Sequence, residues 1–358
     1  MAETASLALS VLDQCPVRAG STPADAIREA VKLARATDRL GYQRYWLAEH
    51  HNSQSLACAA PEALIGQVAA ATSRIRVGSG GVMLSHYSAL KVAEVFRMLE
   101  TLYPGRIDLG IGRAPGSDRF TAHLLAHGPG RLGVQHYPEQ VADLLGYLGR
   151  GHEDDRLNGV RAMPLGDTQP EVWLLGSSLG SARFAAYFGG PFSFAHFIQP
   201  RDAEAALELY RNEYRPSDSH PEPRASVGVS AMVADTDEEA NRQSLSRFLW
   251  WIRLTQGQPG PFPSLEEAEA HDFTEADRAV QRKMRARSLV GAPDAVAARA
   301  RELAKRLGVA ELVVLTICPS FEARRRSYEL LAEAMGLAGR TVDSSDLKPE
   351  DPGVPGRS

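Results

Sequence analysis

The 358-residue chain has an ordinary composition, with 44% apolar residues, 23% charged residues and a formal net charge of −4. These proportions exclude disordered and fibrous classes. The charge is spread along the chain, so neither nucleic acid nor an anionic membrane is an expected partner. No apolar run approaches the ~18 residues of a membrane span, and no signal-peptide pattern opens the chain. We therefore expect a cytoplasmic protein.

A chain of this length can form one large domain or two ordinary ones and bury a substantial core either way. Its three cysteines, Cys15, Cys58 and Cys318, are too few and too widely spaced for a disulfide framework or a CxxC metal site. We expect all three to be reduced thiols.

Eight short segments rich in β-branched or aromatic residues alternate with helical segments. This alternation favours a parallel sheet with crossover helices. Eight repeats favour a closed (β/α)8 TIM barrel of the α/β class over an open doubly wound sheet, and no GxGxxG follows the first strand. The predicted strands are Leu7–Leu12, Arg44–Ala48, Ile75–Leu84, Arg106–Ile111, Val172–Leu175, Phe192–Phe197, Ser226–Val233 and Glu311–Ile317.

Proline and glycine mark the ends of several predicted helices. Three of them begin at a proline, and glycine directly follows two of these, at positions 41 and 308. The predicted helices are 23–40, 61–72 and 293–307, with a further helix near 138–149.

Two stretches, 113–170 and 254–275, exceed ordinary loop lengths. The first must contain the helix near 138–149. The second is rich in Gly, Pro and Glu, and we predict a mobile lid or a disordered insertion there. From about residue 341 onward Asp, Ser, Pro and Gly dominate, which predicts a poorly ordered tail. The prediction is thus one barrel domain with insertions over residues 1–340 and a tail over 341–358.

The strongest local feature is the run Trp46–His51, which ends the second predicted strand where barrel loops carry chemistry. Because side chains alternate along a strand, His50 should face away from Glu49 and His51, so that one imidazole points into the barrel mouth while its neighbours hold the loop. A histidine there could act as a general acid or base, or donate a hydrogen bond to a developing anion. Two alternatives stay open. Both imidazoles could merely cap backbone groups, or they could bind a metal, although consecutive residues converge poorly on one ion.

Glycines interrupt the third predicted strand at positions 78, 80 and 81, near its C-terminal end. Glycine inside a strand often marks a bulge, a strained peptide or the close approach of a ligand or of backbone. A planar aromatic ring is one ligand that could lie there. A simple bend of the barrel is the competing interpretation.

Two glycine-containing segments, Leu109–Arg113 and Leu175–Ser181, follow the fourth and fifth predicted strands. The second offers free N–H groups and hydroxyls at the start of a helix, which can bind a phosphate. Arg113 could add a forked cationic partner. The alternative is that the serines are ordinary helix N-caps.

All four features come just after predicted strands two to five, so one extended ligand could contact them together. Flavin mononucleotide fits, with its ring near His50 and the glycine strand and its phosphate near Arg113 and Ser178.

In order and spacing, these segments resemble the luciferase-like flavin monooxygenases over roughly residues 6–338. Members of that family are (β/α)8 barrels that receive reduced FMN from a separate NAD(P)H:flavin reductase. With O2 they form a flavin C4a-hydroperoxide that oxidises a small organic substrate by hydroxylation, epoxidation or Baeyer–Villiger chemistry. The resemblance implies the same here. It is carried by Gly41–His51, Val77–Leu84, Pro104–Arg113, Val172–Ser178 and Val290–Pro293.

The resemblance also implies roles for individual residues and no metal site. The catalytic histidine of the family's Glu-His-His motif falls on His50, and its non-proline cis peptide beneath the flavin falls on Gly80-Gly81. The phosphate-binding arginine falls on Arg113. The implied cofactor-binding residues are Gly80, Gly81, Gly112, Arg113, Gly176, Ser177, Ser178 and Ser181.

Some positions depart from the family pattern. Gly112 stands where luciferase itself has a cysteine, so light emission is not implied. Many relatives have Leu-Pro-x-His-x-Pro after the glycine strand, and Ser85, Tyr87 and Ala89 replace those residues here, which leaves the substrate-side wall of the pocket open. The sequence is most similar to single-chain members that tailor polyketide antibiotics, which suggests a role in secondary metabolism.

Family members dimerise through the helices after strands two and three, and the 61–72 helix is rich in small apolar residues, so we expect a homodimer. Two other functions stay open on the same barrel. One is a deazaflavin-dependent oxidoreductase, although the sequence Glu-His-His of the motif favours FMN. The other is a non-catalytic FMN-binding protein, which the retained His50 and Arg113 argue against. A metal-dependent barrel hydrolase is a more distant alternative.

Overall fold

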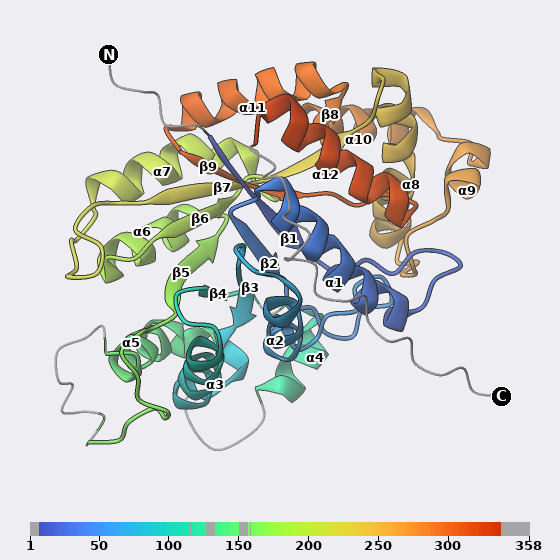
Figure 1. Cartoon of the computed structure of the whole chain (residues 1–358). Helices are drawn as coiled ribbons and strands as arrows, with labels where there is room; N and C mark the ends of the chain where they lie inside the picture. Colours follow the sequence, from blue (N-terminus) through green and yellow to red (C-terminus); the bar gives the residue numbers. More distant parts are fainter. Residues whose placement is uncertain (1–6, 115, 127–132, 150–156, 158, 338–358) are drawn as a thin grey trace, which may run out of the picture.

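The computed structural model describes residues 7–114, 116–126, 133–149, 157 and 159–337 (Figure 1). Within them, parallel strands form one sheet in the order β6-β5-β4-β3-β2-β1-β9-β7-β8, and a further pairing of β6 with β7 closes eight of them into a barrel. The predicted (β/α)8 barrel is therefore confirmed. The strands are β1 Ala8–Asp13, β2 Arg44–Leu47, β3 Arg76–Met83, β4 Ile107–Gly112, β5 Glu171–Gly176, β6 Phe192–Ala195, β7 Ala225–Val233, β8 Leu289–Gly291 and β9 Glu311–Leu315.

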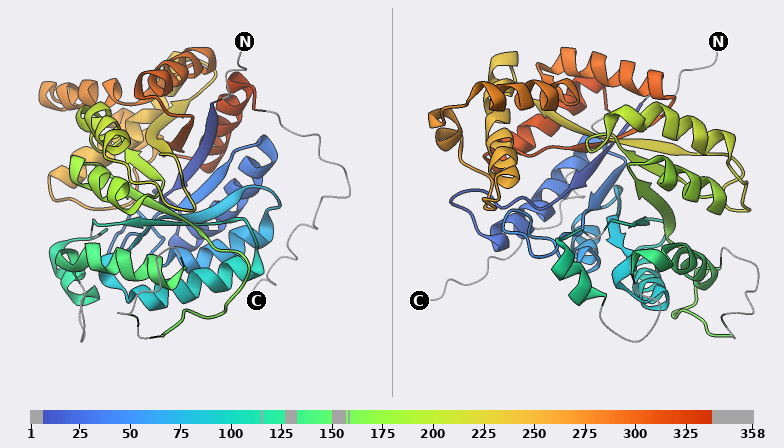
Figure 2. Two further views of the ribbon diagram at one scale, coloured as in Figure 1. Left: turned by 90° about the vertical axis from the view of Figure 1, so that its left-hand side faces the viewer. Right: turned by 180° about the vertical axis from the view of Figure 1, so that it is seen from behind.

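Helices surround the barrel, as the views from three sides show (Figures 1 and 2). No helix in the described part of the chain is both long and apolar enough to cross a lipid bilayer. The α-helices are α1 Pro23–Leu40, α2 Pro61–Ala71, α3 Ala89–Leu102, α4 Arg119–Leu125, α5 Tyr137–Tyr147, α6 Leu179–Phe188, α7 Ala203–Asn212, α8 Asp237–Thr255, α9 Leu265–Ala270, α10 Glu275–Ala286, α11 Pro293–Leu307 and α12 Phe321–Met335.

The ends of α1 show why proline and glycine predicted helix boundaries well. The Asp25 N–H donates to the Thr22 hydroxyl over 3.1 Å, and the Thr22 N–H donates back to the Asp25 carboxylate over 2.9 Å, which forms a capping box. Gly41 then ends the helix with a φ of 86°, a left-handed conformation that favours glycine. The predicted boundaries at 23–40 and 293–307 are confirmed, and the 61–72 prediction is one residue too long.

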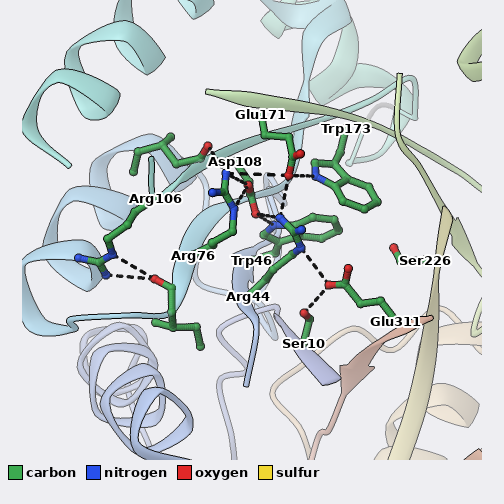
Figure 3. Close-up of polar contacts among 12 residues, drawn as sticks. Ser10, Arg44, Trp46, Arg76, Arg106, Asp108, Glu171, Trp173, Ser226 and Glu311 are labelled. Carbon is green, nitrogen blue, oxygen red and sulfur yellow. Dashed lines mark hydrogen bonds and ion pairs between the residues drawn. The ribbon is translucent and has the colours of Figure 1, made fainter. Parts of the chain in front are cut away.

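Buried charges lie at the amino end of the barrel (Figure 3). Arg44 begins β2 and pairs with Asp108 of β4 at 2.8 Å, Glu171 of β5 at 3.0 Å and Glu311 of β9 at 2.9 Å. The Trp46 indole N–H donates to Asp108 over 2.9 Å. This network joins four strands at the end opposite to the loops where barrel enzymes carry their chemistry.

One strand was not predicted. β8, Leu289–Gly291, is only three residues long and pairs with the carboxyl-terminal part of β7, where Ala231 is paired with Leu289. So short a segment shows no alternation, and its strand conformation depends on a neighbour distant in sequence. The eight barrel strands were all predicted, within one or two residues at most ends.

The prediction of a disordered insertion at 254–275 is wrong. Phe262 is fully buried, its N–H donates to the Val17 carbonyl over 2.8 Å, and its carbonyl accepts from the Ala19 N–H over 2.7 Å. Its ring lies 4.6 Å from that of Trp250. A single aromatic anchor thus orders a segment whose composition is that of a loop.

The long 113–170 segment contains the predicted helix near 138–149, observed as α5, and also α4. The predicted tail over 341–358 lies outside the described residues.

Candidate active site

The loop after β2 is held by a buried carboxylate. Glu49 is fully buried and accepts hydrogen bonds from the Met83 N–H at 3.0 Å and the Tyr87 hydroxyl at 2.7 Å. It also bonds to Nε2 of His51 at 2.6 Å, and the His51 N–H donates to the Gly116 carbonyl over 3.1 Å. Glu49 and His51 therefore fix the loop against the strand end next to it, as the alternation of side chains predicted.

His50 lies between these two residues and has a different environment. Its backbone N–H donates to the Cys58 carbonyl over 2.9 Å, whereas Nδ1 of its ring is buried without a hydrogen-bond partner among the described residues. Burial, and secondarily the charge of His51, lowers the pKa of His50 to about 4. The ring is therefore neutral near pH 7 and can donate at one nitrogen and accept at the other.

The alternative that the two imidazoles only hold neighbouring groups of the loop in place thus fits His51 better than His50. His51 is satisfied by Glu49, but a buried ring nitrogen without a partner is costly unless a ligand satisfies it. No group of three or more His, Cys, Asp or Glu side chains among the described residues could hold a metal ion.

A cavity of about 770 Å³ lies beside His50, at the carboxyl ends of the strands. This volume is in the range of small-molecule and cofactor sites. Loops after β1 and β2 form one wall and the end of α8 forms another, and the walls include His50, His51, Leu56, Trp250, Leu254 and Pro259.

The peptide bond between Gly80 and Gly81 is cis, as the resemblance implied. The protein itself approaches both glycines closely. A Cβ atom on Gly80 would lie 2.7 Å from the Leu12 side chain, and one on Gly81 would lie 2.7 Å from the Gly110 carbonyl oxygen. The register of β3 against β4 also shifts at this point. Close packing therefore requires the two glycines whether or not a ligand lies on them.

The serines at the start of α6 are engaged with each other. The Ser178 hydroxyl accepts from the Ser181 N–H at 3.2 Å, and the Ser178 N–H donates to the Ser181 hydroxyl at 3.1 Å. In this structure the two serines therefore act as a helix N-cap, which was the alternative interpretation. Gly176 packs tightly below them, since a Cβ atom there would lie 2.1 Å from the Ser181 hydroxyl oxygen. No hydrogen bond of the Ser177 side chain is seen in the described structure.

Arg113 follows β4 and is exposed. Its guanidinium carbon lies 6.0 Å from the centre of the Phe184 ring on α6, so its charge lies beside the helix that Ser178 caps. No carboxylate pairs with Arg113 in the part of the chain that the structure describes. An exposed guanidinium favours an anion, and the amino end of α6 favours the same charge.

The predicted residues come together on four neighbouring strand ends. His50 follows β2, Gly80-Gly81 lie in β3, Gly112 ends β4 before Arg113, and Gly176 ends β5 before Ser177 and Ser178. These four strands pair in that order. A Cβ atom on Gly112 would make only an ordinary contact, 3.5 Å from Met83. This glycine is therefore not required by packing.

Sequence reasoning missed the role of Tyr87. It named this residue as a departure from the family pattern and as an aromatic candidate for the substrate pocket, whereas its hydroxyl bonds to Glu49. The raised pKa of Tyr87, due to burial and to the charge of Glu49, keeps the hydroxyl a donor. Nothing in the sequence pairs positions 49 and 87, because they meet only where β2 and β3 end side by side.

The sequence matches the family described as luciferase-like monooxygenase over residues 8–311. It is 37% identical to a luciferase-like monooxygenase of Escherichia coli, over 91% of this chain and 96% of that one. It is 35% identical to the N-acetyl-S-alkylcysteine monooxygenase of Bacillus subtilis, over 93% of this chain and 99% of that one. The crystal structure of apo-MsnO8 is similar with a TM-score of 0.84 and 38% identity, over 93% of this chain and all (100%) of that one.

More distant structures share the fold alone. The oxygenating constituent of 3,6-diketocamphane monooxygenase of Pseudomonas putida, in complex with FMN, has a TM-score of 0.67 and 19% identity, over 92% of this chain and 98% of that one. An F420-dependent secondary alcohol dehydrogenase has a TM-score of 0.63 and 13% identity, over 92% of this chain and 99% of that one. The family model matches residues 8–311, and relatives are more than a third identical to the chain over nearly their full length. This chain therefore belongs to the luciferase-like monooxygenase family.

Proposed function

We propose that this chain is the oxygenase component of a two-component flavin monooxygenase. It would take reduced FMN from a separate NAD(P)H:flavin reductase and use O2 to hydroxylate or epoxidise a small organic substrate, in secondary metabolism. The observation that carries the proposal is the neutral His50 ring, whose buried Nδ1 has no partner in the described structure, beside a cavity of about 770 Å³.

The residues present fit a flavin mononucleotide. Arg113, without a carboxylate partner in the described residues, and the amino end of α6 would hold the phosphate, with Ser178 exchanging its contact with Ser181 for a phosphate oxygen. The Gly80-Gly81 surface would lie under the ring. Reduced FMN, when bound, supplies the electrons that activate O2.

His50 contributes a hydrogen bond from its imidazole ring, which lines the cavity. Its low pKa means that it acts as a neutral donor or acceptor rather than as a standing cation. Trp250, packed on the buried Phe262, adds an apolar wall to the same cavity. Excluding water protects a reactive oxygen species from wasteful decay.

Two measurements test the proposal. Anaerobic titration of the protein with reduced FMN should give saturable binding, and coenzyme F420 should not. When O2 is mixed with the reduced FMN complex, His50→Gln should release hydrogen peroxide roughly tenfold faster than wild type, because about one hydrogen bond to a charged group is lost. His123→Gln, at an exposed histidine of α4, is the control and should behave as wild type.

Other outcomes would replace the proposal. Preferential binding of F420 would indicate a deazaflavin-dependent oxidoreductase. Tight binding of oxidised FMN, with identical O2 reactions of free and bound reduced FMN, would indicate a non-catalytic carrier. Failure to bind FMN in either redox state would rule out both flavin functions.

We also propose that the chain forms a homodimer through α2 and α3. Met98 and Leu102, one turn apart on α3, are 55% and 64% exposed, and the outer face of α2 carries small residues such as Ala63 and Ala70. Apolar side chains grouped in this way are typical of an interface. Sedimentation velocity gives the oligomeric state directly.

A further inference from the structure

A second cavity lies between β7, α8 and α10, at the same end of the barrel as His50. Its volume is about 60 Å³, which is enough for a small polar head group. Much of its wall is apolar, contributed by Met232, Phe248, Met284 and Ile317. Arg247 and Arg285 also line it, and no described aspartate or glutamate does.

Arg247 of α8 is the unusual member of this wall. It donates to the Ser230 hydroxyl, and its guanidinium makes no other hydrogen bond and no ion pair among the described residues. Burial and the nearby charge of Arg287 lower its pKa to about 10. Arg247 is half-buried, and the charge of its guanidinium favours an anion in the cavity that it lines.

Two other arginines show how the same fold satisfies a buried guanidinium with carboxylates. Arg324 is 1% exposed and pairs with Asp13 at 2.7 Å. Arg44, 4% exposed, has three carboxylates within 3.0 Å. Arg247 is half-buried and has no carboxylate partner among the described residues, so an anion that enters the cavity could pair with it.

The Arg247 cavity is next to the candidate active site. Arg247 and Trp250 are three residues apart and therefore lie on the same face of α8. Trp250 lines the His50 cavity. Ile317, which lines the Arg247 cavity, belongs to the same apolar cluster as Trp250. Arg247 therefore lies within one helical turn of the wall of the His50 cavity.

We propose that Arg247, with the Ser230 hydroxyl, binds a carboxylate carried by the organic substrate and so determines which substrates are accepted. The planar guanidinium matches a carboxylate in a two-point contact, and the apolar wall suits the aliphatic or aromatic part attached to it. The inference rests on the proposed monooxygenase function and names the substrate class: small organic acids with an apolar body.

Binding of matched probes to the FMN-loaded protein tests this without any turnover. The probes are 4-phenylbutyrate and its uncharged counterpart 4-phenylbutyramide, followed by calorimetry. Wild type should bind the acid roughly tenfold or more tightly than the amide, because a charge-assisted pair forms only with the acid. In Arg247→Gln this preference should disappear, while the FMN affinity stays unchanged.

Arg242→Gln is the matched control, because Arg242 lies on the exposed face of the same helix and pairs with Glu269 at 2.5 Å. It should keep the preference for the acid. Equal affinity of wild type for acid and amide would overturn the proposal even if Arg247→Gln fails to fold, and so would an Arg247→Gln protein that still prefers the acid. Loss of the monooxygenase function itself would appear separately, as absent FMN binding.

Discussion

Glu49, His50 and His51 follow one another in the chain but have three different states in the folded protein. Glu49 is a fully buried acceptor, His51 is its partner, and His50 keeps a ring nitrogen without one among the described residues. The difference follows from the alternation of side chains at a strand end, which gives neighbours opposite surroundings. Residue identity alone would have made the two histidines equivalent.

The environment of His50 has a consequence for stability against pH. Its pKa is about 4 in the folded chain and near its ordinary value of 6.5 when unfolded. The unfolded chain therefore binds a proton first as the pH falls below 6.5, and stability is lost between about pH 6.5 and pH 4. From pH 7.5 to pH 5.0, wild type should lose about 2 kcal/mol more unfolding free energy than His50→Gln.

Urea unfolding at several pH values measures this difference. His123→Gln, at an exposed histidine, should follow wild type across the range. Parallel pH profiles of wild type and His50→Gln would show that the ring is not shielded in the folded state.

The role of a residue could be predicted from sequence only where it depends on neighbouring positions in the chain or on the order of the strands. The orientation of His50 relative to Glu49 and the closeness of Arg113 to α6 follow from strand alternation and strand order. The partners of Tyr87 and Arg247 do not, since each is decided by which side chains meet across elements. The Ser178 hydroxyl was open to two interpretations because an N-cap and a phosphate ligand use the same atoms at the same helix end.

At the scale of elements, the segment between α8 and α10 shows how tertiary contacts can order a loop-like sequence. α9 is only six residues long and begins with a capping box of Ser264 and Glu267. Phe262 before it connects the segment to the β1–α1 loop by two backbone hydrogen bonds and packs on Trp250. The segment therefore forms part of the wall of the active-site cavity.

Phe262→Ala should detach this segment. Truncating a fully buried phenylalanine removes about 3–5 kcal/mol of packing free energy. A short segment held otherwise by two backbone hydrogen bonds cannot lose that much and remain packed against the barrel. Hydrogen exchange of residues 256–264 should become fast, whereas the barrel strands keep their protection. Gln258→Ala, at an exposed position of the same segment, should change neither. Unchanged protection in Phe262→Ala would mean that other contacts hold the segment.

Boundaries of elements could be predicted where proline and glycine act locally. Thr22, Pro23 and Gly41 fix the ends of α1 through a capping box and a left-handed residue, both of which depend on a few adjacent positions. β8 and α9 are the opposite case. Their few residues carry no periodic pattern. β7 provides the partner of β8, and α8 pairs with α9 through Arg242 and Glu269.

Across the whole molecule, the two ends of the barrel have separate tasks. The carboxyl end carries the His50 cavity, the Gly80-Gly81 surface and Arg247. The amino end carries the ionic network around Arg44, shown in Figure 3. Because the strands themselves separate the two ends, changes in the network should affect stability and leave ligand binding intact.

Arg44→Met tests that separation. It removes the guanidinium that Asp108, Glu171 and Glu311 share. Asp108 keeps its pair with Arg76 and Glu171 its pair with Arg224, but breaking a buried network of this kind still costs about 3–5 kcal/mol. Urea unfolding should show that loss, while the folded variant binds reduced FMN within about threefold of wild type, since a stability change distant from a site leaves its contacts unaltered. Arg183→Met, which removes an exposed pair with Glu213, should cost no more than about 1 kcal/mol. If FMN affinity falls with Arg44→Met as steeply as stability does, the two ends are coupled through the barrel and the division of tasks is wrong.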